Sequence, residues 1–340
     1  MRTKPVAVLL AAGAASTVLG GSEVRIDLVS RPPTMPHWGD ESPCPKTGAY
    51  GQALLSTDEA LWVVRDATAT STPNFWRYDP WSDSWENRDV SSVPDGNFRN
   101  GTAMAWDQDT AIYALGGARY EDRARTSFWR YEISVDSWTE LAPTPGAQGA
   151  GNALTWSGWD QSLYAMLGSR THGTRFVRYR PDTETWTVLS APPERTDDGA
   201  ALAWAGGPKL YALSGEYKET SPVFDFWEYD ISTDTWSYLA DVPDAGGVGD
   251  GGSLLWAGDF DSRLAPYLYA TSGGAFDETP GTLFLRYSIA RDEWYPMPSL
   301  PYEIGYYNGN RLGFVDGRLF LWQAGRSNFI GGGRKLISLQ

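Results

Sequence analysis

The chain has very little of the two residue types that build most disulfides and zinc sites. Among its 340 residues there is one cysteine, Cys44, and there are two histidines, His37 and His172. One cysteine excludes a disulfide within the chain and any zinc cluster built on cysteines. Two isolated histidines leave little for catalysis at a metal held by several histidines. We therefore predict no cofactor and no bound metal.

Basic residues are also scarce. Lysine and arginine number 28 against 42 aspartates and glutamates, which gives a formal net charge of −14. A phosphate backbone would be repelled, so we predict no nucleic-acid partner. No stretch beyond the first twenty residues approaches the roughly 18 apolar residues of a membrane helix. Apolar residues at helical spacing are nearly absent as well. We predict no membrane span in the mature chain.

Glycine, proline and aromatic residues are abundant instead. The chain has 37 glycines, 22 prolines, 17 tryptophans and 18 tyrosines. This is too rich in turns and rings for an ordinary two-domain α/β enzyme, and a hydrophobic content of 41% excludes wholesale disorder.

The first 21 residues have the pattern of a secretory signal. A basic start, Met1 to Lys4, precedes an apolar run to about Leu19, and small residues suited to cleavage lie between Ala14 and Gly21. A short buried strand or helix is the alternative. We predict a signal peptide at 1–21 and a secreted, extracellular or periplasmic protein made of residues 22–340.

A repeat dominates the rest of the chain. Five tyrosines each precede a tryptophan by seven residues, in segments such as WRYEISVDSW; the pairs are Tyr78–Trp85, Tyr131–Trp138, Tyr179–Trp186, Tyr229–Trp236 and Tyr287–Trp294. A glycine, which we call the ring glycine, also opens a short run in each unit; the six are Gly51, Gly101, Gly151, Gly199, Gly251 and Gly309. A short apolar segment of the IYALGG kind follows each of these runs. Repeats of about fifty residues indicate propellers or solenoids.

Each unit predicts four short strands, which we label a to d. Strand a runs from the glycine, b is the IYALGG segment, c ends at the tyrosine and d begins at the tryptophan. Four antiparallel strands per unit are typical of a propeller blade. The tyrosines and tryptophans occur in every blade, which favours a role in packing neighbouring blades over a sugar-stacking platform.

These features resemble the kelch-repeat β-propellers. The double glycines Gly116-Gly117 and Gly273-Gly274 after strand b, followed by the spaced tyrosine and tryptophan, carry the resemblance. Other units depart from it, as at Gly168-Ser169 and Ser214-Gly215. The resemblance implies an all-β, six-bladed, kelch-like β-propeller of the kind found in the central domain of galactose oxidase, with four antiparallel strands per blade.

The sixth unit lacks a strand d. Its strands a and b start at Gly309 and Leu319, and a possible strand c, Lys335–Leu339, meets the chain end. The N-terminal segment VRIDLVSRPP, from Val24, has the shape of a strand d. We predict that this N-terminal strand closes the last blade, since closure removes exposed edges. A plain linker is the alternative.

Strand alternation separates two faces. The a–b and c–d connections form the turn face, whose c–d turns are short and polar. The b–c and d–a connections form the loop face, where the loops are long and variable, and recognition is commonly placed on such loops. We predict ligand binding on the loop face, by Asn100, Asp198, Asp250, Asn308, Arg311, Arg119, Tyr120, Arg170, Tyr217, Phe276, Tyr306 and Arg326.

The channel mouth is the most specific part of this prediction. Asn100, Asp198, Asp250 and Asn308 directly precede ring glycines and should converge near the axis. Arg311 stands where five other blades have alanine or serine, which suggests an anion contact or a salt bridge to Asp250 or Asp198. A calcium ion on the four oxygen-bearing residues is an alternative to ordered water.

We predict a secreted binding module for an extracellular glycan or protein, with no catalytic residues assigned. A sugar-modifying enzyme of the sialic acid mutarotase kind is one alternative, with Glu216, Glu303 or Asp198 and Arg311 as an acid/base set. A structural subunit of a surface assembly is another. Clustered copper histidines, as in galactose oxidase, and the glycine of a sialidase Asp-box are missing from the sequence.

Overall fold

The computed structural model describes two units of the chain. The described residues are 17–19, 22–24, 37–45, 52–65, 73–94, 97–99, 101–117, 125–169, 173–216, 222–243, 246–258, 264, 266–273, 283–301, 311–323 and 335–339. The first unit, Met1–His37, contains a hairpin of β1 (Thr17–Leu19) and β2 (Ser22–Val24). The second unit, Trp38–Gln340, contains all the other strands.

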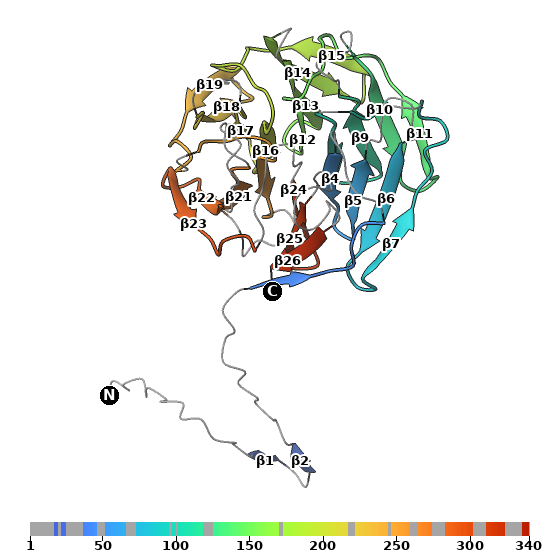
Figure 1. Ribbon diagram of the computed structural model, residues 1–340, viewed down its shortest axis with the longest axis vertical. Helices are drawn as coiled ribbons and strands as arrows, with labels where there is room; N and C mark the ends of the chain where they lie inside the picture. Colours follow the sequence, from blue (N-terminus) through green and yellow to red (C-terminus); the bar gives the residue numbers. More distant parts are fainter. Residues whose placement is uncertain are drawn as a thin grey trace, which may run out of the picture. The chain divides into compact units, whose positions relative to one another are not determined.

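The second unit is a six-bladed β-propeller (Figure 1). Blade 1 consists of β4 (Gln52–Ser56), β5 (Leu61–Arg65), β6 (Asn74–Asp79) and β7 (Ser84–Asn87). Blade 2 consists of β8 (Ala103–Trp106), β9 (Ala111–Leu115), β10 (Phe128–Glu132) and β11 (Ser137–Glu140). Blade 3 consists of β12 (Ala153–Ser157), β13 (Ser162–Ser169), β14 (Gly173–Arg180) and β15 (Thr185–Val188).

The remaining blades repeat this pattern. Blade 4 consists of β16 (Ala201–Trp204), β17 (Lys209–Leu213), β18 (Phe226–Asp230) and β19 (Thr235–Tyr238). Blade 5 consists of β20 (Ser253–Trp256), β21 (Tyr267–Thr271), β22 (Phe284–Ser288) and β23 (Glu293–Pro296). Blade 6 consists of β24 (Arg311–Val315), β25 (Arg318–Gln323), β26 (Lys335–Leu339) and β3 (Trp38–Asp40). All pairings are antiparallel, which confirms the predicted four-strand units.

An N-terminal strand closes the last blade, as the sequence predicts, but it is not the strand expected to begin at Val24. The strand in that place is β3, where Trp38 pairs with Leu339 of β26. The Trp38 ring also packs edge-on against Phe284 of blade 5, with centroids 5.4 Å apart. The segment at Val24 has no tryptophan to make this contact, and Val24 belongs to the β1–β2 hairpin.

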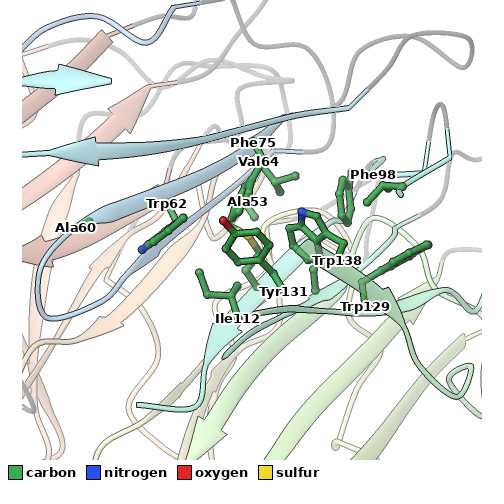
Figure 2. Close-up of a cluster of buried hydrophobic side chains, with 13 residues drawn as sticks. Ala53, Ala60, Trp62, Val64, Phe75, Phe98, Ile112, Trp129, Tyr131 and Trp138 are labelled. Atoms are coloured by element: carbon green, nitrogen blue, oxygen red, sulfur yellow. The ribbon is translucent and has the colours of Figure 1, made fainter. Parts of the chain in front are cut away.

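The seams between blades contain the core. In each ladder the repeat tyrosine lies directly opposite its tryptophan, as in Tyr131 and Trp138. Both rings pack on a phenylalanine of the preceding blade: the Phe75 centroid lies 4.8 Å from that of Tyr131 and 5.0 Å from that of Trp138 (Figure 2). The same triplet recurs around Phe128, Phe176 and Phe226. The predicted packing role of these aromatics is confirmed.

Candidate functional site at the channel mouth

The d–a connections end in tight turns just before the innermost strands. The Ala200 backbone N–H donates to the Asp197 carbonyl at 3.0 Å, and the Gly252 N–H donates to that of Gly249 at 2.9 Å. In the turns that lead into blades 2, 4 and 5 the third residue is a ring glycine with positive φ, namely Gly101, Gly199 and Gly251, whereas Gly151 does not have a positive φ. Such turns need φ above zero at that position, which glycine adopts without strain. They place Asp198 and Asp250 at the second position.

Successive turns touch through their backbones. A Cβ added to Gly199 would collide with the carbonyl oxygen of Gly249 in the next blade. A Cβ added to Gly101 would collide in the same way with the Gly149 carbonyl. The ring glycines therefore allow the backbones of neighbouring turns to meet where the innermost strands begin. This contact fixes the mouth of the channel on the loop face.

Arg311 lies at this mouth, at the start of β24. Its side chain is half-buried and lines a cavity of about 180 Å³ bounded by the innermost strands of all six blades. One guanidinium nitrogen, Nη1, donates to the Gly252 carbonyl at 3.3 Å. Burial lowers the pKa of Arg311, and the charges of Asp250 and Asp198 oppose that shift. The charges of two predicted residues, Asp198 and Asp250, thus act on a third, Arg311.

Further charged side chains are buried on the loop-face side of the blades. Asp197 and Arg99 are buried and occupy the first positions of their turns, and Glu216 is buried beside Asp198, to whose carbonyl its N–H donates at 2.7 Å. Asp197 and Arg99 lie on the predicted loop face but were not among the predicted binding residues. Their position in the repeat could have indicated them, because each lies two residues before a ring glycine. Burying a charged side chain is costly, and such side chains are concentrated at functional sites.

The other predicted site residues lie outside the described residues. These are Asn100, Asn308, Arg119, Tyr120, Arg170, Tyr217, Phe276, Tyr306 and Arg326. Within the described ranges, no group of three or more histidine, cysteine, aspartate or glutamate side chains could hold a metal ion. Two of the four ligands in the calcium alternative, Asn100 and Asn308, lie outside the described residues.

The opposite end of the cavity has a different chemistry. Four tryptophans at the ends of the innermost strands line it, namely Trp106, Trp156, Trp204 and Trp256. Each also packs into a hydrophobic seam cluster. The cavity is therefore charged where the strands begin on the loop face and aromatic where they end on the turn face.

Neither a known protein family nor a curated protein matches the chain. In the part of the chain that the structure describes, no helix is long and apolar enough to cross a membrane. The fold and the mouth together define the class of the protein, a six-bladed β-propeller whose axial cavity opens among buried charged side chains.

Proposed function

We propose that this protein is a kelch-type propeller that works outside the cytoplasm as a glycan-binding module. The double glycines and the tyrosine–tryptophan spacing support the kelch relationship, and the pattern of residues 1–21 supports export. The observation that carries the binding role is the position of Arg311 in the cavity, with the charges of Asp198 and Asp250 acting on it.

The chemistry of the mouth favours a polyhydroxylated ligand. A guanidinium only donates hydrogen bonds and a carboxylate only accepts them, whereas a sugar hydroxyl does both. A mouth containing both groups can therefore satisfy adjacent hydroxyls of one ring. The cavity of about 180 Å³ is smaller than the roughly 300–1,000 Å³ of pockets that enclose drug-sized ligands. It suits the terminal unit of a glycan, with the rest of the ligand resting on the loops.

A glycan array tests this function. The purified protein should give saturable binding to a defined set of glycans. Arg311→Ala should abolish it, while Arg291→Ala, which removes an exposed arginine of a c–d turn, should leave it unchanged. Asp250→Asn supplies a second variant in case loss of Arg311 impairs folding, which a thermal melt would show. A blank array, or equal loss in both arginine variants, would refute the glycan role and favour a protein partner or an assembly role.

Export is tested separately. N-terminal sequencing of the protein recovered from outside the producing cells should find a new N-terminus near residue 22. Recovery of the protein only in the cytoplasm with Met1 retained would contradict the proposed localisation.

A further inference from the structure

The turn face of blades 1 to 3 is strongly acidic. Its six turns span residues 57–60, 80–83, 107–110, 133–136, 158–161 and 181–184. They contain nine acidic residues and no lysine or arginine; the acids are Asp58, Glu59, Asp83, Asp107, Asp109, Asp136, Asp160, Asp182 and Glu184. One basic residue, Arg180 at the end of β14, directly precedes the last of these turns in the sequence. We call these six turns the acidic patch.

Exposed apolar side chains occur in the same turns. Trp81 is 79% exposed, Val135 is 66% exposed and Trp159 is 58% exposed. The positions equivalent to Trp81 in blades 2 to 5 hold Ser134, Asp182, Ser232 and Ala290. Neither Trp81 nor Trp159 has a ring pair or an indole hydrogen bond with any residue that the structure describes. The fold therefore does not explain these two exposed tryptophans, and exposed apolar groups rimmed by polar residues mark interaction sites.

Some acids of the patch are engaged by the fold and others are not. Asp83, Asp136 and Asp160 accept hydrogen bonds from tyrosine hydroxyls. Arg88 also lies 3.4 Å from Asp136, and Arg178 lies 3.7 Å from Asp160, so these charges are partly neutralised. Arg318 donates to the Pro80 carbonyl at the edge of the patch. Asp58, Glu59, Asp109, Asp182 and Glu184 are exposed, and none forms an ion pair with the described residues. Their charge faces solvent in the same set of turns that contains the two exposed tryptophans.

We infer that the acidic patch is a docking surface for a basic segment, rich in arginine or lysine, of another protein. Charge complementarity selects this occupant, because the five exposed acids without an ion pair among the described residues attract a cationic chain and repel a second copy of this protein or an anionic membrane. The exposed indoles supply the specific contact, since tryptophan is the best ring for binding a guanidinium or ammonium group. This surface lies on the face opposite the Arg311 mouth and does not depend on the glycan site.

Fluorescence anisotropy with a labelled twelve-residue peptide of alternating arginine and serine tests the inference. Binding to the full chain is expected at low salt and should weaken as salt rises. Each exposed cation–π contact contributes about 2- to 5-fold in affinity. The double variant Trp81→Ala/Trp159→Ala should therefore weaken binding about 4- to 25-fold. The matched double variant Val188→Ala/Tyr238→Ala, at exposed positions on β15 and β19, should leave it unchanged.

A charge-matched pair of variants tests the electrostatic part. Asp58→Asn/Glu59→Gln/Asp109→Asn should weaken peptide binding and flatten its salt dependence. Glu140→Gln/Glu194→Gln/Asp241→Asn removes the same charge from exposed positions outside the patch and should have less than half the effect on affinity. Absence of peptide binding at low salt, or equal effects of the two triple variants, would overturn the inference. So would self-association in sedimentation that the Trp81→Ala/Trp159→Ala variant abolishes. Arg311→Ala should not alter peptide binding, which separates this result from the glycan test.

Discussion

The Tyr287 hydroxyl donates a 2.7 Å hydrogen bond to Oδ1 of Asp292 across the c–d turn of blade 5. The same oxygen accepts the backbone N–H of Ala240 from blade 4 at 2.8 Å, and the Trp294 indole donates to the Ala240 carbonyl at 2.9 Å. One tyrosine, one aspartate and one tryptophan thus hold the chain of the preceding blade, and we call this arrangement the clamp. The same arrangement recurs with Tyr229, Asp234, Trp236 and Ser190, and at the closing seam with Tyr78, Asp83, Trp85 and Ser42.

Breaking this clamp should cost stability. Asp292→Ala removes a charged acceptor from two hydrogen bonds, and bonds to charged groups contribute about 1.5–3 kcal/mol. Because Asp292 is exposed and water partly replaces its bonds, we expect the free energy of unfolding in urea to fall by about 2–4 kcal/mol, which is less than the sum of the two bonds. Glu184→Ala is the matched control. Glu184 occupies the equivalent turn position with φ of 53°, as Asp292 does, but accepts no hydrogen bond from Tyr179 or from the preceding blade. Equal losses in the two variants would contradict the clamp.

The clamp tyrosines predict a loss of stability at high pH. Burial, followed by the hydrogen bond to aspartate, raises the pKa values of Tyr131, Tyr229 and Tyr287 well above the ordinary value of 10. Burial also raises the pKa of Tyr179, a repeat tyrosine that has no such hydrogen bond, to about 12. The folded state then keeps protons that the unfolded chain releases above pH 10. The stabilisation is complete below pH 10 and declines as the pH rises toward the folded values.

Each such tyrosine adds about 1.4 kcal/mol per pH unit to the decline. Phenolate absorbance and circular dichroism, followed together from pH 9 to 13, should show the clamp tyrosines ionising only as the protein unfolds. Ionisation of all tyrosines near pH 10 with an unchanged dichroism spectrum would refute this.

The glycine contacts at the channel mouth predict a steric effect beyond backbone strain. Gly199→Ala places a methyl group against the Gly249 carbonyl of the next blade and also strains a positive φ. Gly206→Ala imposes the same kind of φ strain in an open a–b turn, where nothing lies within 4 Å. The control should lose about 1–2 kcal/mol of stability, and Gly199→Ala should lose several times more or fail to fold. Similar melting temperatures for the two variants would contradict the contact.

Closure by β3 predicts a role for Trp38. Trp38→Ala removes the ring contact with Phe284 and the strand's main anchor, so the free energy of unfolding should fall by about 2–3 kcal/mol, somewhat less than for a fully buried ring. Trp159→Ala removes an exposed ring and should change it by less than about 0.5 kcal/mol. A Trp38→Ala protein as stable as the Trp159→Ala protein would show that β3 does not hold the ring closed.

Much of the fold follows from local patterns. The tyrosine–tryptophan spacing determines a c–d hairpin in five blades, and Lys335–Leu339 was predicted as a strand with the bounds it has in β26. The closing strand was misplaced because Leu339, not a tyrosine, faces Trp38, so the spaced pair was not visible in the sequence. Trp38 itself was the available signal.

The candidate site was less predictable. Asp198, Asp250 and Arg311 were predicted as binding residues because each breaks or marks the repeat at one position of the unit. The burial of Asp197 and the exposure of Trp159 depend on how neighbouring blades pack, which no local pattern contains. The acidic patch was also not predicted, because its acids belong to six turns that come together on one face only when the blades form.

The most direct test of the account asks whether the two faces bind independently. The affinity of the strongest array glycan and of the arginine–serine peptide should be measured for the unaltered protein, Arg311→Ala and Trp81→Ala/Trp159→Ala. We predict that Arg311→Ala loses the glycan and keeps the peptide, and that the tryptophan variant loses peptide affinity and keeps the glycan. A correctly folded Arg311→Ala protein that still binds the glycan at full affinity would contradict the central claim that the channel mouth is the binding site.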